Sequence, residues 1–412
     1  MTQFAKKRLW LKSKNPLQPD SRNLLQFNSR NLLQPNSRFW IAVIGLIFCV
    51  IVIANSGFFT VKRGDDFTTQ RGRVLATDDS NLLPDPYVDN MLTGTQVLKV
   101  EILTGSFKGQ VFDYVENKLS PLFNNYATKN IVMLFNIRSE DGVAQRVDIF
   151  GYSRDFLIYA LIGLFLLLLV AIGRKKGLYS AIGLLFTLIT VIFFMIPFIL
   201  RGHSPILMAI LTAAFTSVFS IFMVGGVSLR SAASICGILL GVTAAAVIGI
   251  AAGKIGHISG LNTGDAEGTL FLAKNLPLKI PELLFAGIII ATLGAGMDVS
   301  MSITSAIFEV YQANPGLNMR QLYNSGMNIG RDTMGTMSNT LILAFAGSSI
   351  NVLIIISLYN LPYICLINLN LFVVEMIQGI SGAVGLILTV PVTAALTAAV
   401  VTGNKIIPAR GK

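Results

Sequence analysis

The feature that most constrains the fold is a series of long apolar runs, several of which reach the ~20 residues needed to cross a ~30 Å hydrocarbon core. Hydrophobic residues make up 53% of the 412-residue chain and charged residues only 13%. A backbone within lipid must satisfy its own hydrogen bonds, so such runs form helices. The sequence therefore predicts an α-helical polytopic membrane protein with about eight transmembrane helices. We expect them at Phe39–Phe59, Leu157–Ile172, Leu178–Leu200, Pro205–Val227, Ser231–Ala252, Pro281–Met297, Met337–Leu358 and Ile364–Val400.

The last of these runs is longer than one crossing needs. We expect its first half, LINLNLFVVEMIQGI, to lie partly in the membrane interface as an amphipathic or broken segment. The second half, VGLILTVPVTAALTAAV, then makes the crossing, with a break or kink at Pro391.

The rest of the chain divides by composition. The N-terminal segment repeats an eight-residue pattern, NPLQPDSR, NLLQFNSR, NLLQPNSR, which supplies little that could be buried. The predicted domains are a basic low-complexity cytoplasmic tail at 1–38, a first transmembrane helix at 39–60, an extracytoplasmic β-rich domain at 61–152, a seven-helix membrane domain at 153–403 and a basic cytoplasmic tail at 404–412.

The net charge of +11 does not indicate nucleic-acid binding, because the basic residues cluster beside the apolar runs. The first 38 residues hold eight Lys or Arg and one Asp. Basic residues flanking spans mark the cytoplasmic side, so eight helices place both termini in the cytoplasm and the β-rich domain outside. The lipid bilayer is the expected partner, and the basic tail either fixes topology or also contacts anionic headgroups.

The predicted β-rich domain carries several segments of partial alternation, such as TQVLKVEILTG and NIVMLFNI, separated by turn residues. Several short strands in under a hundred residues predict a small barrel or sandwich of OB type. We expect the stretch from Asp65 to Asp89, with Pro84 and Pro86, to be an irregular connector.

Asp298 is the leading candidate site residue, because it ends an apolar segment in which a carboxylate is costly. It is followed at helical spacing by Ser302, Ser305 and Glu309, which places all four on one helical face. Gly294 and Gly296 precede them and would allow a neighbouring backbone to approach. Asp298 is either a proton or ion acceptor, or an ionised residue at the cytoplasmic interface that caps the polar helix after it.

A second group of candidates lies in 319–340, a helical pattern interrupted by glycines. Its members are polar residues that lead back into hydrocarbon. Arg331 or Asp332 could reach Asp298 or Glu309 from a facing segment. The remaining members either modulate such a site or join helices by hydrogen bonds. These are Thr336, Asn339 and Thr340.

Glu375 is the second carboxylate candidate within an apolar run. Gly379 and Gly382 follow it at helical spacing and form a face that permits close helix contact. A carboxylate beside a helix broken at Pro391 is typical of transporter sites. The alternative is an interfacial helix with its one charge in water.

Soluble-enzyme motifs are absent from the sequence, including HExxH, a phosphate loop ending in Gly-Lys-Ser/Thr, and Gly-x-Ser-x-Gly. The three cysteines lie in apolar runs and the two histidines stand alone, so no disulfide framework or metal site is indicated. We therefore expect no enzymatic activity, no cofactor and no metal.

At GAGMDVSMSITSAIFE, SGMNIGRDTMGTMSNTLILAFAG and EMIQGISGAVGLILTVPVTA the chain resembles the YibE/F-like family of bacterial membrane proteins. The resemblance covers most of the chain from the β-rich domain to the last helix. It implies a multi-pass protein of the bacterial cell membrane with an extracytoplasmic domain after the first helix. A Gly-x-x-x-Asp segment followed by a Thr-rich one is also similar to the layout of resistance-nodulation-division permeases, which couple proton flow to transport.

These observations favour a proton- or ion-coupled permease that uses Asp298 and Glu375. The alternative is a non-transporting membrane scaffold whose β-rich domain binds a partner or an envelope component. A homo-oligomer or a complex with a second membrane protein is compatible with either function.

Overall fold

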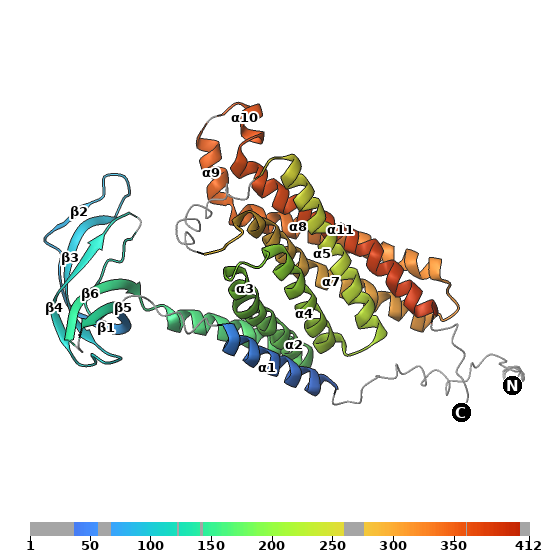
Figure 1. Ribbon diagram of the computed structural model, residues 1–412, viewed down its shortest axis with the longest axis horizontal. Coiled ribbons are helices and arrows are strands. Elements are labelled where there is room, and N and C mark those ends of the chain that lie inside the picture. Colours follow the sequence, from blue (N-terminus) through green and yellow to red (C-terminus); the bar gives the residue numbers. More distant parts are fainter. Residues whose placement is uncertain are drawn as a thin grey trace, which may run out of the picture. The chain divides into compact units, whose positions relative to one another are not determined.

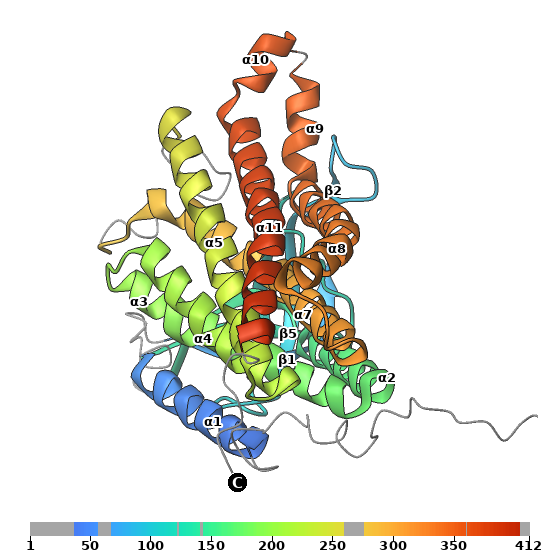
Figure 2. The same ribbon diagram turned by 90° about the vertical axis from the view of Figure 1, so that its right-hand side faces the viewer.

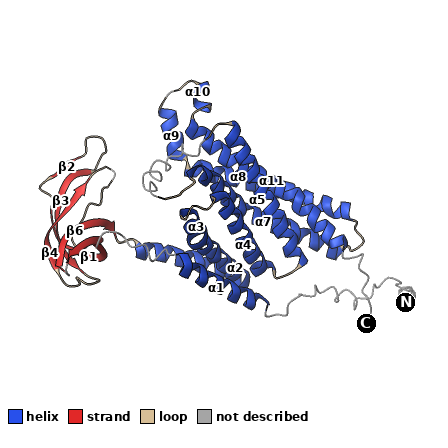
Figure 3. Ribbon diagram, in the orientation of Figure 1, coloured by secondary structure: helices blue, strands red, loops and turns tan. Residues whose placement is uncertain are grey.

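The computed structural model describes residues 37–56, 67–121, 123–140, 143–258, 276–359 and 361–403. It divides into two compact units, one of residues 59–174 and one of residues 1–58 with 175–412. The strands all lie in the first unit, and the second is helical (Figure 1, Figure 3). The octad repeat and the C-terminal tail lie outside the described residues.

The β-rich part of the first unit is a six-stranded antiparallel sheet that curves into a half-barrel. Its central strand, β1, pairs with β3 (Leu92–Ile102) on one side and with β5 (Val132–Glu140) on the other. Strand β4 extends the sheet beyond β3, and β6 extends it beyond β5. This is the order of an OB-type Greek-key barrel, left open because no ladder joins β4 to β6 among the described strands. The strands are β1 Phe67–Asp78, β2 Leu82–Pro84, β3 Leu92–Ile102, β4 Val111–Leu119, β5 Val132–Glu140 and β6 Val143–Tyr152.

The core of the half-barrel follows the two-residue period of its strands. Leu98, Val100, Phe135 and Ile137 are fully buried on its inner face. The buried amide of Gln96 joins this sheet to the loop before β5, because its Nε2 donates to the Ala127 carbonyl at 2.8 Å.

Strand β1 corrects the expectation of an irregular connector at Asp65–Asp89. Its inward positions carry Gln70 and Gly72 as well as Val74, so the apolar half of the alternation is weak. Gly72 lies against Phe135 and Val100, where an added Cβ would come within 2.8 Å of both side chains. Close packing at a small residue, which a hydrophobicity pattern does not register, makes this segment the central strand.

Helix α2 (Asp155–Ile189) contains a break at Arg174, whose φ of 49° is not helical. The break lies between the two predicted spans Leu157–Ile172 and Leu178–Leu200. The helical stretch continues through the π-helix η1 (Thr190–Met195) and α3 (Ile196–Leu200). Before the break, large apolar side chains such as Leu161 and Phe165 are exposed along the helix, as expected where lipid is the solvent.

The second unit also contains the remaining helices, which Figures 1 and 2 show from two sides. Five described helical stretches are long and apolar enough to cross a membrane, and a sixth is counted if α8 and α9 form one bent span. The remaining helices are α1 Ser37–Ser56, α4 Pro205–Gly225, α5 Leu229–Ile255, η2 Ile280–Glu282, α7 Leu283–Ala313, α8 Met319–Ser348, α9 Ile350–Leu358, α10 Tyr363–Ile367 and α11 Asn370–Gly403.

Three predicted helix ends or interruptions are wrong. In each, packing against neighbouring helices lets the helix continue through residues that usually end or interrupt one. Helix α7 does not end near Met297 but continues to Ala313. The glycines of α8 do not interrupt it, since Gly326 packs against Ile307 of α7; the bend of 62° comes later, between α8 and α9. Helix α11 runs continuously through Pro391 and includes Glu375.

Small residues set the spacing at the centre of the helical unit, where α5, α7 and α11 lie side by side (Figures 1 and 2). A Cβ added to Gly241 of α5 would lie 1.8 Å from Thr389 Oγ1, and one added to Gly385 of α11 would lie 2.8 Å from the Gly241 carbonyl oxygen. Helices in lipid associate through such close packing rather than through the hydrophobic effect. The contact among α5, α7 and α11 is therefore the core of the helical unit.

Candidate functional site

Asp298 lies at the midpoint of α7, with 15 helical residues on each side. Its side chain is exposed, as are those of Ser302 and Glu309, and Ser305 is half-buried. The prediction that these four residues share one face of one helix is confirmed. Gly294 also lies on this outward face and has no atom within 4 Å of an added Cβ, so the expected close backbone approach there is wrong.

The carboxylate of Asp298 makes no hydrogen bond or ion pair with a described residue. Arg331 instead donates to Asn328 of its own helix at 3.3 Å. The predicted contact of Arg331 or Asp332 with Asp298 or Glu309 is therefore not formed among the described residues. No counter-charge among the described residues offsets the cost of placing Asp298 in an apolar helix.

Helix α8 presents a polar face at the same depth as Asp298. Gly330 packs against Ile303, and Gly326 packs against Ile307, so the two helices run antiparallel. Continuing this register places the level of Asp298 near Gly335. Exposed polar or glycine positions of α8 lie on both sides of that level: Asn328, Arg331, Asp332, Gly335, Thr336, Asn339 and Thr340.

The threonines of α8 do not join helices as one interpretation of the sequence suggested. Thr336 Oγ1 donates to the Thr333 carbonyl at 3.0 Å, and Thr340 Oγ1 donates to the Thr336 carbonyl at 2.9 Å. Both hydroxyls are thus satisfied within their own helix. The outward surface of α8 is therefore polar, but these two hydroxyls make no hydrogen bond to a neighbouring helix.

Hydroxyls that do join helices lie on the inward face of α7, and sequence reasoning missed them. The Ser300 hydroxyl is 2.9 Å from that of Ser234 on α5 and 3.2 Å from that of Thr393 on α11. One turn further, Thr304 and Thr397 hydroxyls are 3.2 Å apart. The missed signal was the one-turn spacing of Ser300 and Thr304, which recurs in Thr393 and Thr397.

Glu375 belongs to a different place from Asp298. It borders a small cavity of about 60 Å³ beside Phe345 and Ser349, at the α8–α9 bend. Helices α7 and α11 run in the same direction, since Ser300 contacts Thr393 and, one turn further along both helices, Thr304 contacts Thr397. This register places Asp298 level with Pro391, so Glu375 lies 16 residues, or about 24 Å, away from the level of Asp298 along the helix axes. The two predicted carboxylates do not share one cavity.

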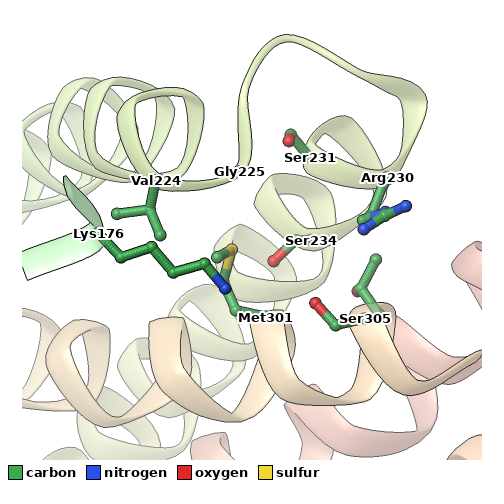
Figure 4. A pocket seen from close by; sticks show the side chains of 9 residues that line it. Lys176, Val224, Gly225, Arg230, Ser231, Ser234, Met301 and Ser305 are labelled. Carbon is green, nitrogen blue, oxygen red and sulfur yellow. The ribbon is translucent and has the colours of Figure 1, made fainter. Parts of the chain in front are cut away.

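A larger cavity, which we call the basic cavity, has a volume of about 250 Å³. Figure 4 shows Lys176 and Arg230 on opposite sides of it, with Ser234 and Ser305 between them. Sequence reasoning treated these two cations only as markers of the cytoplasmic side. The nine described residues that line the basic cavity are Lys176, Val224, Gly225, Arg230, Ser231, Ser234, Met301, Thr304 and Ser305.

No group of three or more His, Cys, Asp or Glu side chains in the described segments could hold a metal ion. The described segments thus offer an unpaired carboxylate at the midpoint of α7, a polar face of α8 at the same level, and a separate cavity lined by two cations.

The family comparison covers the helices that carry these features. The model of the YibE/F-like protein family matches residues 161–403, more than half of the chain. The chain belongs to the YibE/F-like family. The matched residues of this YibE/F-like protein include Asp298, all of α8 and the basic cavity, whereas the β-rich domain, to which we expected the resemblance to extend, precedes them. No curated protein and no solved structure matches the chain.

Proposed function

We propose that this YibE/F-like membrane protein is a proton- or ion-coupled permease in which Asp298 binds the coupling ion. The observation that carries the proposal is the unpaired carboxylate at the midpoint of the 31-residue helix α7. Ionisable residues in membrane helices are rare and mark ion or proton pathways when they have no structural partner. The proposal assigns no catalytic reaction to the chain.

The polar face of α8 supports a water-accessible path beside Asp298. Arg331, Asp332 and Asn339 are exposed at or near the depth of Asp298. Exposing such a face to hydrocarbon costs free energy, because lipid offers no hydrogen-bonding partners. A second copy of this chain, or another membrane protein, packed over α7 and α8 would enclose this face and leave a hydrated path along it.

The proposed topology has eight crossings with both termini in the cytoplasm and the β-rich domain outside the plasma membrane. The crossings are α1, the two parts of α2 separated at Arg174, α4, α5, α7, the α8–α9 pair and α11. Lys176 and Arg230 support this arrangement, because they line one cavity and so lie at the same end of the helices. Both then fall on the cytoplasmic side, as the positive-inside rule expects.

The test is ion flux through the full chain reconstituted in liposomes. Proton entry would be followed by an enclosed pH dye under a potassium-diffusion potential, and ²²Na⁺ uptake would be measured in parallel. We expect Asp298→Asn to abolish the flux while the protein stays folded. Glu309→Gln, on the same face but near the end of α7, is the matched control and should retain the flux. Equal flux in Asp298→Asn and in the unaltered protein would refute the proposal.

The scaffold alternative is favoured by a separate observation in the β-rich domain. Large side chains there are exposed, including Tyr87 at 93% and Phe123 at 71% of their surface. Aromatic residues on a surface often anchor a partner protein. Capture of an envelope protein by the full chain, lost in Tyr87→Ser with Phe123→Ser, together with no flux in liposomes, would favour the scaffold over the permease.

A further inference from the structure

The basic cavity concentrates positive charge from separate elements of the helical unit. Lys176 comes from the second part of α2, and Arg230 from the first turn of α5. None of the nine described residues that line the cavity is acidic. Neither cation makes an ion pair with a described residue. Two like charges that share a cavity repel each other, so an anion bound between them would relieve an unfavourable interaction.

Arg230 is held in place without using its hydrogen bonds. Its guanidinium carbon lies 4.6 Å from the centre of the Phe308 ring of α7, within the range of a cation–π contact. Because no hydrogen bond or ion pair joins Arg230 to a described residue, its N–H groups are available to a ligand. A planar guanidinium fixed in this way is suited to bidentate binding of an oxyanion.

Hydroxyl groups complete the polar lining. Ser234 and Thr304 belong to the hydroxyl contacts between helices described above, and Ser231 donates to the Gly226 carbonyl at 2.6 Å. Ser305 differs, because its hydroxyl has no hydrogen-bond partner among the described residues. Figure 4 shows it between the two cations. Lys176, Arg230 and Ser305 thus offer donors from three helices.

The start of α5 adds a further favourable field. This 27-residue helix begins at Leu229, after the cap that Ser228 provides by accepting from the Ser231 N–H. The N-terminus of a helix carries a partial positive charge that attracts anions. Its contribution adds to that of the two side chains and has the same sign.

We propose that the basic cavity is a binding site for a phosphate-type oxyanion, held by Lys176 and Arg230 with Ser305 as a hydrogen-bond donor. A tetrahedral phosphate presents oxygens in several directions, which fits donors that converge from three helices. The cavity volume of about 250 Å³ exceeds that of a single water site several-fold and leaves room for such a group. This binding site goes beyond the proposed ion-coupled transport and does not depend on it.

The same chemistry has two sources, a free phosphate or the headgroup of an acidic lipid, and two arms of one experiment distinguish them. In the first, the purified full chain in phosphatidylcholine nanodiscs is equilibrated with radiolabelled inorganic phosphate. In the second, the protein is incubated with equal amounts of phosphatidic acid and phosphatidylcholine, and retained lipid is identified by native mass spectrometry. Binding of inorganic phosphate in the first arm indicates a free phosphate. Selective retention of phosphatidic acid in the second arm, without binding of inorganic phosphate in the first, indicates a lipid headgroup.

Variants connect the binding to the cavity. Lys176→Gln and Arg230→Gln should each weaken it by about tenfold or more, the usual effect of removing a hydrogen bond to a charged group. Arg230→Lys keeps the charge and tests whether the planar guanidinium is needed. Lys254→Gln, an exposed cation in the last turn of α5, is the control and should bind as the unaltered chain does.

Two results would overturn the proposal. One is no binding of inorganic phosphate and no preference for phosphatidic acid by the unaltered chain. The other is a loss of binding in Lys254→Gln equal to that in Lys176→Gln, which would indicate diffuse surface charge. Size-exclusion profiles of all variants would show that a loss of binding does not reflect unfolding, and a misfolded Arg230→Gln leaves Lys176→Gln to decide.

Discussion

The inward and outward faces of α7 both carry polar side chains, but only the inward set is bonded to neighbouring helices. Ser300 and Thr304 meet hydroxyls of α5 and α11 in a contact that is packed against glycines. Asp298 and Ser302 face outward, with no hydrogen bond between their side chains and a described residue. Polar residues in one membrane helix can thus serve assembly on one side, while on the other they remain available for a ligand, an ion or a partner.

The comparison predicts that added volume is harmful on the inward side only. Gly385→Val should destabilise the helical unit by about 3 kcal/mol, because backbone atoms of α5 would have to move. Gly294→Val, on the outward face, meets no atom within 4 Å and should leave the folded protein intact. Thermal unfolding in detergent measures both, and equal destabilisation would remove the distinction between the faces.

Removing a hydroxyl should have a smaller effect with the same asymmetry. Ser300→Ala deletes hydrogen bonds to Ser234 and Thr393 and should cost about 1 kcal/mol. Ser302→Ala removes a hydroxyl from the outward face and should change the stability by less than about 0.5 kcal/mol. Denaturant titration of the purified variants tests the pair, and a larger loss in Ser302→Ala would mean that the outward face is also structural.

The smallest expected effect concerns Glu375. Because it lies about 24 Å from the level of Asp298 along the helix axes, Glu375→Gln should change ion flux by no more than about twofold. Flux measured as for Asp298→Asn provides the test. A complete loss in Glu375→Gln would require both carboxylates in one path and would contradict their separation in the structure.

The sequence predicted the features that depend on continuous patterns. Apolar runs located α4 and α5 closely, and helical spacing placed Asp298, Ser302 and Glu309 on one face. Alternation and turn residues predicted short strands of a small barrel or sandwich, although they missed the central strand β1. These features could be predicted because each depends on residues near one another in the chain.

Features that depend on packing between distant segments were missed or wrong. Helix α11 passes through Pro391, and α8 passes through Gly330, because neighbouring helices hold them on both sides of the breaker. Lys176 and Arg230 are 54 residues apart in sequence, so no local motif indicated that they line one cavity. The distance of Glu375 from Asp298 likewise follows from helix register, which the sequence alone does not fix.

The most direct test of Asp298 as the ion-binding residue measures ion flux per folded protein in Asp298→Asn and Ser300→Ala side by side. We expect Asp298→Asn to keep the thermal stability of the unaltered chain and to lose the flux. Ser300→Ala should instead lose stability and keep the flux. Flux that survives in Asp298→Asn, or that disappears only in Ser300→Ala, would contradict the assignment of Asp298 as the ion-binding residue.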